Sequence, residues 1–409
     1  MYKLLRDTIF YFGTLVARSL PPWKEAQVME VFPPIVSIPV SLPVNYSNLP
    51  NNFAIKFINS KTIPARRIFI LKDVYVSGQA VVFKNLRIFL SSLTWLKDLD
   101  LYRQGKFLLR QWVGNVQYSE TETIALVYDQ WSAENYYHWI IESLPRILLV
   151  QEKYPQCIFI IPEPAPEFIR TTISLLGITK LVRLPVHPGS ALKALKLVLP
   201  ELVYYYEEEE YTRLLQEQKR IKTNKSRLSI ELSNSPENHN EELITIVRSK
   251  LLSHYNNNPV TPKRKIFASR SRQKTRRLIN EEEISPLLNK YGFELVYFEG
   301  MTFNEQVNLM RETAVFLGVH GANMVNILFM QSGTKVIEMM NQDYMNEAYY
   351  FLSSTIKLPY YSVPCTMADP AIILADDPVK LNDADLVVNI TELEEVLNMC
   401  NHSILHFNN

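Results

Sequence analysis

The clearest chemical pattern in the sequence is the nine-residue string from Gly318 to Asn326, which reads GVHGANMVN. It follows an apolar run at 314–319 and opens the next expected helix, so it lies at the sheet edge where α/β proteins bind ligands. Gly321 lets a phosphate approach backbone N–H groups, and a helix N-terminus favours an anion. The pattern predicts an anion site around His320 and Gly321. A tight turn without a ligand is the alternative interpretation.

A second candidate is the basic segment 262–277, in which eight of sixteen residues are Lys or Arg and none is acidic. Such a run is usually a solvated face, and nucleic-acid contact is the other standard interpretation. Apart from Phe267, however, it lacks the aromatic residues on which single-stranded bases stack. Because Arg offers a bidentate fork to phosphate oxygens, we expect Arg270 and Arg276 to bind a diphosphate.

A third candidate is the segment 131–146, on a helix expected at 133–152. Helical spacing places Asn135, His138 and Glu142 on one face. A His–Glu pair one turn apart is a plausible proton acceptor, because the carboxylate orients the imidazole and compensates its charge. A single His on a helix is more often structural, and this interpretation stays open.

Other polar strings have simpler explanations. Residues 302–305 have the form of a helix capping box, which accounts for Glu305 without a function. Asp98-Leu-Asp100 resembles the Asp-x-Asp string that holds a metal and a nucleotide sugar in some transferases, but it follows Lys97 and is expected to be an exposed turn. His and Cys residues do not cluster at metal-ligand spacing, so no metal is predicted.

These residues require strands and helices that alternate. Apolar strands are expected at 123–128, 157–161, 195–199, 265–268, 294–298, 314–319 and 335–339, with helices between most of them. That order predicts an α/β fold with parallel sheets covered on both faces. A polar stretch at 233–240 separates two α/β halves. The predicted domains are an N-terminal amphipathic helix (1–22), an acceptor-side domain (23–235), a linker and hinge (236–262) and a C-terminal nucleotide-sugar-binding domain (263–409).

The N-terminal helix repeats apolar residues at helical spacing: Leu5, Ile9, Phe12, Val16 and Leu20. One interpretation is a helix packed on the body of the protein. The other is an interfacial helix that touches anionic lipid, because basic residues lie near the apolar ones.

Composition narrows the class of protein. The chain has 409 residues, 43 basic and 42 acidic, and this balance excludes a broad polyanion binder. No G-x-G-x-x-G or Walker A string occurs. The three cysteines fit a reducing compartment, and neither a signal peptide nor an apolar run of about 18 residues is present. We therefore expect a cytoplasmic protein, with membrane association through the first helix as the alternative.

Taken together, these motifs resemble glycosyltransferase family 61, a group found in bacterial surface-polysaccharide loci, plants and animals, and the bacterial type is expected here. The resemblance covers about residues 125–340. The matching strings are 135–146, Ser269-Arg270, Arg276-Arg277, Asn280-Glu281, 292–294, 303–306, 318–322 with Asn326, and Gly333 with 336–338. The family usually has a second Gly after the His-Gly-Ala string, and this chain has Asn323 there.

The resemblance implies a GT-B architecture, in which two Rossmann-like domains face each other across a cleft and the C-terminal one binds the nucleotide-sugar donor. It also implies inverting transfer of a hexosyl or pentosyl group to a hydroxyl of a glycan acceptor, and a UDP-sugar is expected from the family alone. The expected donor-binding residues are Ser269, Arg270, Arg276, Glu305, His320, Gly321, Ala322, Asn326 and Glu338.

Within this expectation each group has a role. His138 or Glu142 takes the proton of the acceptor hydroxyl, with Asn135 on the acceptor side. Arg270, Arg276 and the backbone amides beside His320 and Gly321 stabilise the leaving diphosphate in place of a metal, while Glu305 and Glu338 hold ribose or donor hydroxyls. No cofactor and no nucleic-acid partner are expected. The alternative is a non-catalytic glycan-binding or nucleic-acid-binding protein that uses the segment 262–277.

Overall fold

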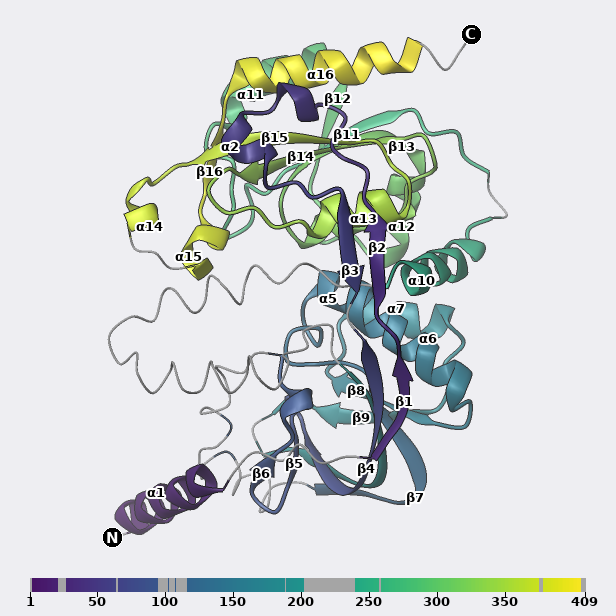
Figure 1. Ribbon diagram of the computed structural model, residues 1–409, viewed down its shortest axis with the longest axis vertical. Helices are drawn as coiled ribbons and strands as arrows, with labels where there is room; N and C mark the ends of the chain where they lie inside the picture. Colours follow the sequence, from purple (N-terminus) through teal and green to yellow (C-terminus); the bar gives the residue numbers. More distant parts are fainter. Residues whose placement is uncertain are drawn as a thin grey trace. The chain divides into compact units, whose positions relative to one another are not determined.

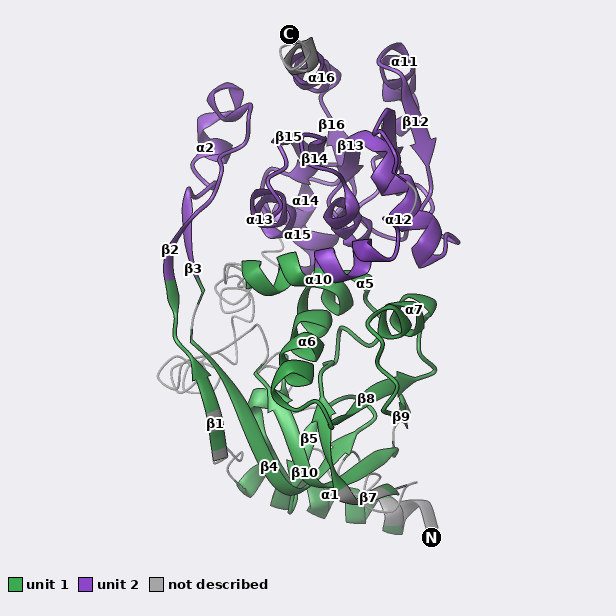
Figure 2. Cartoon of the chain, turned by 90° about the vertical axis from the view of Figure 1, so that its right-hand side faces the viewer, with its two compact units in different colours: residues 1–35, 63–212, 238–247 green, residues 36–62, 213–237, 248–409 purple. Residues whose placement is uncertain are grey.

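The computed structural model describes residues 2–20, 27–63, 65–94, 102, 107, 116–187, 189–201, 240–256, 259–374 and 378–405 (Figure 1). Asp98-Leu-Asp100 lies outside the described residues, so the exposed turn expected there is not addressed. The chain divides into two compact units (Figure 2). Unit 1 comprises residues 1–35, 63–212 and 238–247, and unit 2 comprises residues 36–62, 213–237 and 248–409.

Unit 1 is built on an eight-stranded mixed sheet in which the strand order is β6-β5-β4-β10-β7-β8-β9 and β1 pairs with β4. The pairs β10–β7, β7–β8 and β8–β9 are parallel, and β10–β4, β4–β5, β5–β6 and β1–β4 are antiparallel. The strands are β1 (Gln27–Phe32), β4 (Arg66–Ser77), β5 (Val82–Lys84), β6 (Arg87–Ile88), β7 (Val116–Leu126), β8 (Ile158–Glu163), β9 (Leu181–Pro185) and β10 (Ala191–Pro200).

The helix after β7 begins as α5 (Tyr136–His138), widens into a π-helical turn η4 (Trp139–Ser143) and continues as α6 (Leu144–Lys153). Its apolar side is anchored by Trp139, whose indole Nε1 donates to Thr172 Oγ1 at 2.8 Å. That threonine lies on α7 (Glu167–Leu175). Single-turn π-bulges are rare and often occur at functional sites. The remaining helices are α1 (Tyr2–Ser19) and the short 3₁₀-helix η2 (Leu90–Ser92).

Unit 2 holds a six-stranded sheet of order β12-β11-β13-β14-β15-β16. All pairs are parallel except β15–β16. The strands are β11 (Arg264–Ala268), β12 (Phe293–Val296), β13 (Thr313–Val319), β14 (Lys335–Asn341), β15 (Tyr360–Met367) and β16 (Leu386–Val388). The sequence order of the first five strands in the sheet is 2-1-3-4-5, so the direction of winding reverses between β11 and β13. Ligands of doubly wound sheets bind at such a switch point.

Helices cover both faces of this sheet (Figure 1). On one face α11 (Glu281–Lys290) and α16 (Ile390–Leu405) pack Ile284, Leu288, Leu393 and Leu397 onto strand residues such as Leu317 and Ile337. On the other face lie α12 (Phe303–Glu312), the 3₁₀-helix η5 (Ala322–Phe329) and α13 (Ala348–Thr355), where Phe303 and Phe329 meet edge to face. Unit 2 also contains η1 (Tyr46–Asn48) and α2 (Asn51–Ala54), the C-terminal segments α14 (Ala371–Leu374) and α15 (Pro378–Asp383), and α10 (Glu241–Ser253), which crosses the unit boundary. β2 (Ile35–Pro39) and β3 (Ser60–Ile63) form a separate two-stranded sheet.

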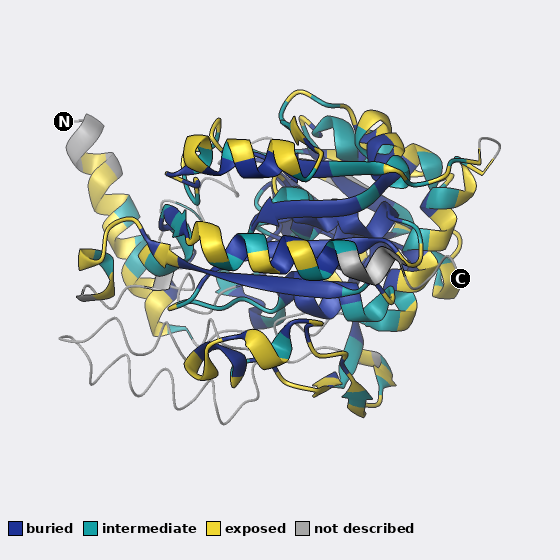
Figure 3. Cartoon of the chain, turned by 90° about the horizontal axis from the view of Figure 1, so that it is seen from above, coloured by how far each residue is buried: buried dark blue, intermediate teal, exposed yellow. Residues whose placement is uncertain are grey.

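Burial follows the strands, which are largely covered in both units (Figure 3). The α/β fold class predicted from the alternating strands and helices is therefore confirmed. Parallel pairing holds throughout β11 to β15 and for the β10-β7-β8-β9 half of unit 1, while the N-terminal strands add antiparallel pairs to the latter.

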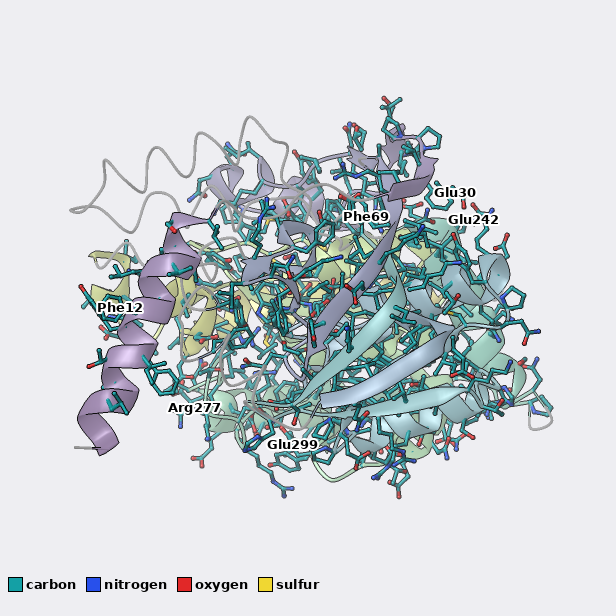
Figure 4. All side chains as sticks on the ribbon, turned by 90° about the horizontal axis from the view of Figure 1, so that it is seen from below. Phe12, Glu30, Phe69, Glu242, Arg277 and Glu299 are labelled. Atoms are coloured by element: carbon teal, nitrogen blue, oxygen red, sulfur yellow. The ribbon has the colours of Figure 1, made fainter. Side chains whose placement is uncertain are left out.

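Helix α1 differs from the rest of unit 1 because its apolar side chains are exposed (Figures 3 and 4). Leu5, Ile9, Phe12 and Val16 all lie in contact with solvent, and Ala17 is buried. The predicted helix is thus confirmed, but the interpretation that these side chains pack on the body is wrong. Contact of α1 with lipid stays a prediction. None of the helices formed by the described residues has the length and apolarity to cross a bilayer.

Candidate active site

The segments expected to form the anion site come together at the switch point of unit 2. β11 and β13 are neighbours with Ala268 opposite Gly318, so the residues that follow them emerge at the same edge of the sheet. Ser269 and Arg270 follow β11, and His320 and Gly321 follow β13. The structure thus brings together two segments that lie about 50 residues apart in the chain, at the place where α/β sheets bind ligands.

Arg270 lies directly against the backbone of Gly321. A Cβ atom built on Gly321 would stand 1.9 Å from Arg270 Nη1, so a larger residue at this position would displace the guanidinium. Two carbonyl groups of its own loop hold the guanidinium, because Nε donates to Arg276 O and Nη2 to Thr275 O, both at 3.2 Å. Burial and the charge of Arg276 lower the pKa of Arg270 to about 10, so the group stays cationic at neutral pH. With only 6% of its surface exposed, Arg270 is a fixed positive charge at the sheet edge.

The loop 270–276 closes on the same edge. Arg276 has a positive φ of 57° and its amide donates to Asp383 O, which fixes the backbone beside Arg270. The Arg276 Nε atom is buried without a hydrogen-bond partner and lies 4.0 Å from Asp383 Oδ1. Two guanidinium groups therefore meet at one loop, as predicted for a diphosphate site, and one of them holds an unsatisfied N–H donor.

Ser269 has a structural contact at this edge. Its buried Oγ lies 2.8 Å from both carboxylate oxygens of Glu281, the first residue of α11, and 3.0 Å from Ser271 Oγ. Ser269 therefore ties the end of β11 to the following helix. Its expected role as a donor ligand stays a prediction.

His320 forms the end of a hydrogen-bonded chain that runs across two strands. Its Nδ1 lies 2.6 Å from Glu338 Oε1, and Glu338 Oε2 accepts from the Tyr360 hydroxyl at 2.7 Å. Glu338 is 0% exposed. The sequence led us to expect that Glu338 holds ribose or donor hydroxyls. The structure corrects this expectation, because both carboxylate oxygens are engaged beneath the imidazole and away from solvent.

The remaining donor-site candidates lie on α12 and η5. Thr302 and Glu305 form the predicted capping box, in which Glu305 Oε2 accepts from Thr302 N at 2.7 Å. Asn326 is fully buried and its Nδ2 donates to Gln306 Oε1 and Asn323 O. These contacts join α12 to η5 and thereby stabilise the two helices that carry these candidates. Direct donor contacts by Glu305 and Asn326 are not shown.

Ala322 opens η5, and its amide is better placed than that of His320. The first hydrogen bond within η5 runs from Met324 N to Gly321 O, which leaves the amides of Ala322 and Asn323 at the open end of the helix. The amide of His320, by contrast, donates to Met339 O. Of the amides expected to act beside His320 and Gly321, those of Ala322 and Asn323 are therefore the better placed.

Most other charges of the segment 262–277 have partners within unit 2. Arg264, at the opposite end of β11, pairs with Glu294 at 2.6 Å and with Glu312 at 3.1 Å. Arg277, which is labelled in Figure 4, pairs with Asp385 at 2.6 Å, and Arg272 stacks on the Tyr297 ring at 3.7 Å. Because these charges are paired, the segment does not present the continuous cationic face that nucleic acid would require. The cations that remain for a ligand are those just after the end of β11.

Sequence reasoning missed two groups near Arg270. Gln273 Nε2 donates to Glu299 Oε1, and Glu299 Oε2 is buried without a hydrogen-bond partner. Tyr349 on α13 packs on His320 with ring centroids 5.0 Å apart. The position of Glu299 after β12, at the carboxyl end of a parallel strand, was a signal that could have found it. Tyr349 lies in an apolar run, so the sequence contains no signal of its place beside His320.

The catalytic pair predicted in unit 1 is also formed. His138 Nδ1 lies 2.7 Å from Glu142 Oε1, and the two side chains are 16% and 3% exposed. Glu142 belongs to the π-helical turn, and the rings of Trp131 and Tyr137 flank the imidazole. His138 is therefore the member of the pair that solvent or an acceptor reaches, while Glu142 lies beneath it.

Asn135 is the N-cap of this helix rather than a member of its polar face. Its Oδ1 accepts from the amides of Tyr137 and His138 at 3.0 and 3.4 Å. This contact fixes the start of the helix and so the position of His138. An acceptor contact by Asn135 stays a prediction.

Buried charges surround the His138–Glu142 pair. Arg146 donates from Nε to Glu142 O and from Nη2 to Asp129 Oδ2 at 2.7 Å. Burial raises the pKa of Asp129, but the charges of Arg146 and His138 outweigh it, so the net pKa is lowered and the carboxylate stays ionised. Arg66 on β4 is a further buried cation, whose pKa burial and Arg146 lower to about 10. Arg66 lies outside the segment that carried the motifs, and Asp129 was signalled only by its place after β7.

The fit of Gly321 against Arg270 gives a first testable expectation. Gly321→Ala is expected to displace the guanidinium and weaken UDP binding by about tenfold, which corresponds to about 1.4 kcal/mol. Isothermal titration calorimetry with UDP measures the change.

Gly333→Ala is the matched control. Gly333 has a positive φ of 82°, but no atom lies within 4 Å of the place where its Cβ would stand, so alanine there costs about 1 kcal/mol of backbone strain and leaves UDP affinity unchanged. Equal UDP affinities in Gly321→Ala and the unaltered chain would show that Arg270 does not meet the nucleotide here.

Comparisons with known proteins find glycosyltransferases. A family model described as Glycosyltransferase 61 matches residues 136–337, a range that contains His138, Glu142, Arg270 and His320. The EGF domain-specific O-linked N-acetylglucosamine transferase of Drosophila melanogaster is 34% identical over 73 residues, which are 17% of this chain and 14% of that protein. The chain thus matches only a small part of that relative. Among the described residues, no three His, Cys, Asp or Glu side chains gather as a metal site would require.

Proposed function

We propose, on the premise that the chain belongs to glycosyltransferase family 61 through residues 136–337, that it transfers a sugar from a nucleotide-sugar donor to a hydroxyl of a glycan acceptor. The observation that carries this proposal is the cationic switch point of unit 2, where Arg270 lies against Gly321 at the joint edge of β11 and β13. The bacterial surface-polysaccharide type expected from the sequence stays a prediction.

The donor half of the proposal concerns the leaving group. The diphosphate of a UDP-sugar lies over Gly321, where it meets Arg276, Nη1 of Arg270 and the open amides of η5. These groups are fixed before the donor binds, so they stabilise the charge that develops on the leaving oxygen without reorganisation. Arginine charges do here what a metal ion does in other transferases, and no metal takes part in the proposed steps.

The acceptor half concerns the base. His138 is more exposed than Glu142, so its Nε2 takes the proton of the acceptor hydroxyl while Glu142 holds Nδ1–H. The oxygen attacks the anomeric carbon, the bond from that carbon to the phosphate oxygen breaks, and the nucleoside diphosphate leaves with the electron pair. One displacement inverts the anomeric configuration. The GT-B arrangement implied by the family is part of the proposal, since both halves must serve one donor and one acceptor.

A panel of nucleotide sugars tests the proposal by thermal shift on the full chain. UDP-N-acetylglucosamine is the first probe because the name of the Drosophila relative specifies that sugar. A donor at about 100 times its Kd adds about 2.7 kcal/mol and raises the melting temperature by several degrees. Stabilisation by a single-stranded oligonucleotide and by no nucleotide or nucleotide sugar would instead favour the nucleic-acid alternative and overturn the proposal.

A further inference from the structure

The hydrogen-bonded triad His320–Glu338–Tyr360 is more extensive than an anion site requires. Three side chains, one from the residue after β13 and two from β14 and β15, are joined by two short hydrogen bonds of 2.6 and 2.7 Å, and only the imidazole reaches the surface, with 12% of its side chain exposed. A diphosphate needs positive charge at this place, and a neutral imidazole supplies none. The hydrogen-bonded triad must therefore have a role that the arginines do not fill.

We propose that His320 takes up a proton when the donor diphosphate binds and then donates a hydrogen bond from Nε2 to the leaving phosphate, with Glu338 and Tyr360 as positioning residues. This inference rests on the proposed function of the switch-point site. It adds a group that touches the leaving oxygen and two residues that act through it.

Hydrogen bonding fixes which nitrogen meets the ligand. Glu338 Oε1 accepts the hydrogen bond from the imidazole, so Nδ1 carries a hydrogen, and Nε2 is the nitrogen left for a ligand. Tyr360 donates to Oε2 and is fully buried. Burial and the neighbouring Glu338 raise the pKa of Tyr360 well above its usual value, so it remains a donor at any physiological pH. Glu338 therefore cannot rotate away from the imidazole.

The charges around His320 explain why protonation depends on the ligand. Burial lowers the pKa of His320, Glu338 on β14 raises it, and Arg276 and Arg270 from the loop after β11 lower it. The net shift is downward, so the empty site holds a mostly neutral imidazole at neutral pH. A diphosphate brings negative charges that offset the two arginines. The same site then favours the imidazolium form. Tyr349 on α13 packs on the ring.

The proton balance closes without another reagent. On binding, one proton moves from solvent to Nε2 of His320. During transfer the anomeric carbon–oxygen bond breaks, the phosphate oxygen keeps the electron pair and accepts the Nε2–H hydrogen bond, and the acceptor's proton goes to His138. When the nucleoside diphosphate leaves, His320 returns its proton to solvent, and His138 releases to solvent the proton that it took from the acceptor.

Calorimetric titration of the full chain with UDP-N-acetylglucosamine tests the inference. The diphosphate of this probe is esterified at both ends and does not titrate near neutral pH, so any proton taken up belongs to the protein. Titrations at pH 7.5 in two buffers of different ionisation enthalpy are expected to show uptake of about 0.5 to 1 proton per donor bound. Because a proton is taken up on binding, the affinity for the probe rises as pH falls. The rise is up to about tenfold per pH unit between the pKa of His320 in the empty site and its higher pKa in the complex.

Three variants separate this role from a structural one. His320→Gln is expected to bind the probe with no proton uptake. Tyr360→Phe removes the donor to Glu338 Oε2, which leaves more negative charge facing His320 and moves the midpoint of the pH profile upward. His254→Gln, which removes an exposed histidine of the same unit, is expected to leave uptake unchanged. If Tyr360 had only a structural role, Tyr360→Phe would lower the melting temperature and leave the pH dependence of binding unchanged.

The outcomes distinguish the two proposals. Binding of the probe by the unaltered chain without proton uptake, or uptake that persists in His320→Gln, overturns the inference and leaves the proposed function intact. If neither UDP nor the probe binds the unaltered chain, the proposed function fails and the inference fails with it.

Discussion

Replacing Arg270 with alanine is expected to raise the Kd for UDP by about 100-fold. The side chain is the most buried cation at the switch point and lies against Gly321, where the diphosphate would approach. Loss of hydrogen bonds to a charged group costs about 1.5–3 kcal/mol, and a further cost arises because the loop 270–276 loses the donor to Thr275 O and Arg276 O. Calorimetry with UDP on the full chain measures the affinity.

Arg264→Ala is the matched control, since it removes the same charge from the same basic segment. Arg264 lies at the opposite end of β11 and pairs with Glu294 and Glu312, so the variant is expected to bind UDP as the unaltered chain does. Arg270→Lys keeps the charge without the planar fork, and an intermediate affinity is expected. Equal losses in Arg264→Ala and Arg270→Ala would indicate a diffuse electrostatic effect and contradict a defined diphosphate site.

The fold was predictable where local pattern and burial agree. The predicted strands 265–268 and 314–319 correspond to β11 (Arg264–Ala268) and β13 (Thr313–Val319), and the capping box predicted at 302–305 opens α12 (Phe303–Glu312). Strands of a doubly wound sheet are buried on both faces, so their apolar runs are continuous and easily recognised. The observed boundaries agree with the predicted ones because a capping box and turn glycines mark them in the sequence.

The candidate site was predictable only for residues whose position follows from strand ends. Arg270 and His320 are two residues and one residue past the ends of β11 and β13, so topology alone places them at one edge. The expectation for Glu338 was wrong because its surroundings depend on β15, which comes later in the chain and supplies Tyr360. A carboxylate in the middle of a buried strand needs a partner, and the sequence does not name it.

The unit 1 cluster shows the same limit. His138 and Glu142 were paired correctly from their spacing of four residues, but the π-helical turn that carries Glu142 has no signature in the sequence. Arg66 enters the cluster from β4, more than 70 residues upstream of the pair, and no local pattern predicts that contact.

Glu142→Gln is expected to lower kcat for sugar transfer by about 1000-fold while UDP affinity stays within about twofold. Glu142 is the hydrogen-bond partner of His138 Nδ1, and without its charge the imidazole loses both its fixed tautomer and the compensation of the proton it accepts. General-base catalysis contributes about 10²–10⁴-fold, and this range sets the expected loss. UDP binding is spared because the proposed diphosphate contacts all lie in unit 2. Product formation with a nucleotide sugar that stabilises the chain, together with UDP calorimetry, measures the two quantities.

Glu152→Gln controls for the loss of one carboxylate on the same helix, since Glu152 is exposed on α6, and full activity is expected. His138→Gln decides which member of the pair is the base. If His138 takes the proton and Glu142 orients it, the two substitutions act on one step, so the double variant is no slower than the worse single one. Independent, multiplying losses would assign separate roles to the two residues. A Glu142→Gln variant that keeps its transfer rate would remove the His138–Glu142 pair from the mechanism, because a buried carboxylate 2.7 Å from the proposed base cannot be neutralised without consequence for the proton that base accepts.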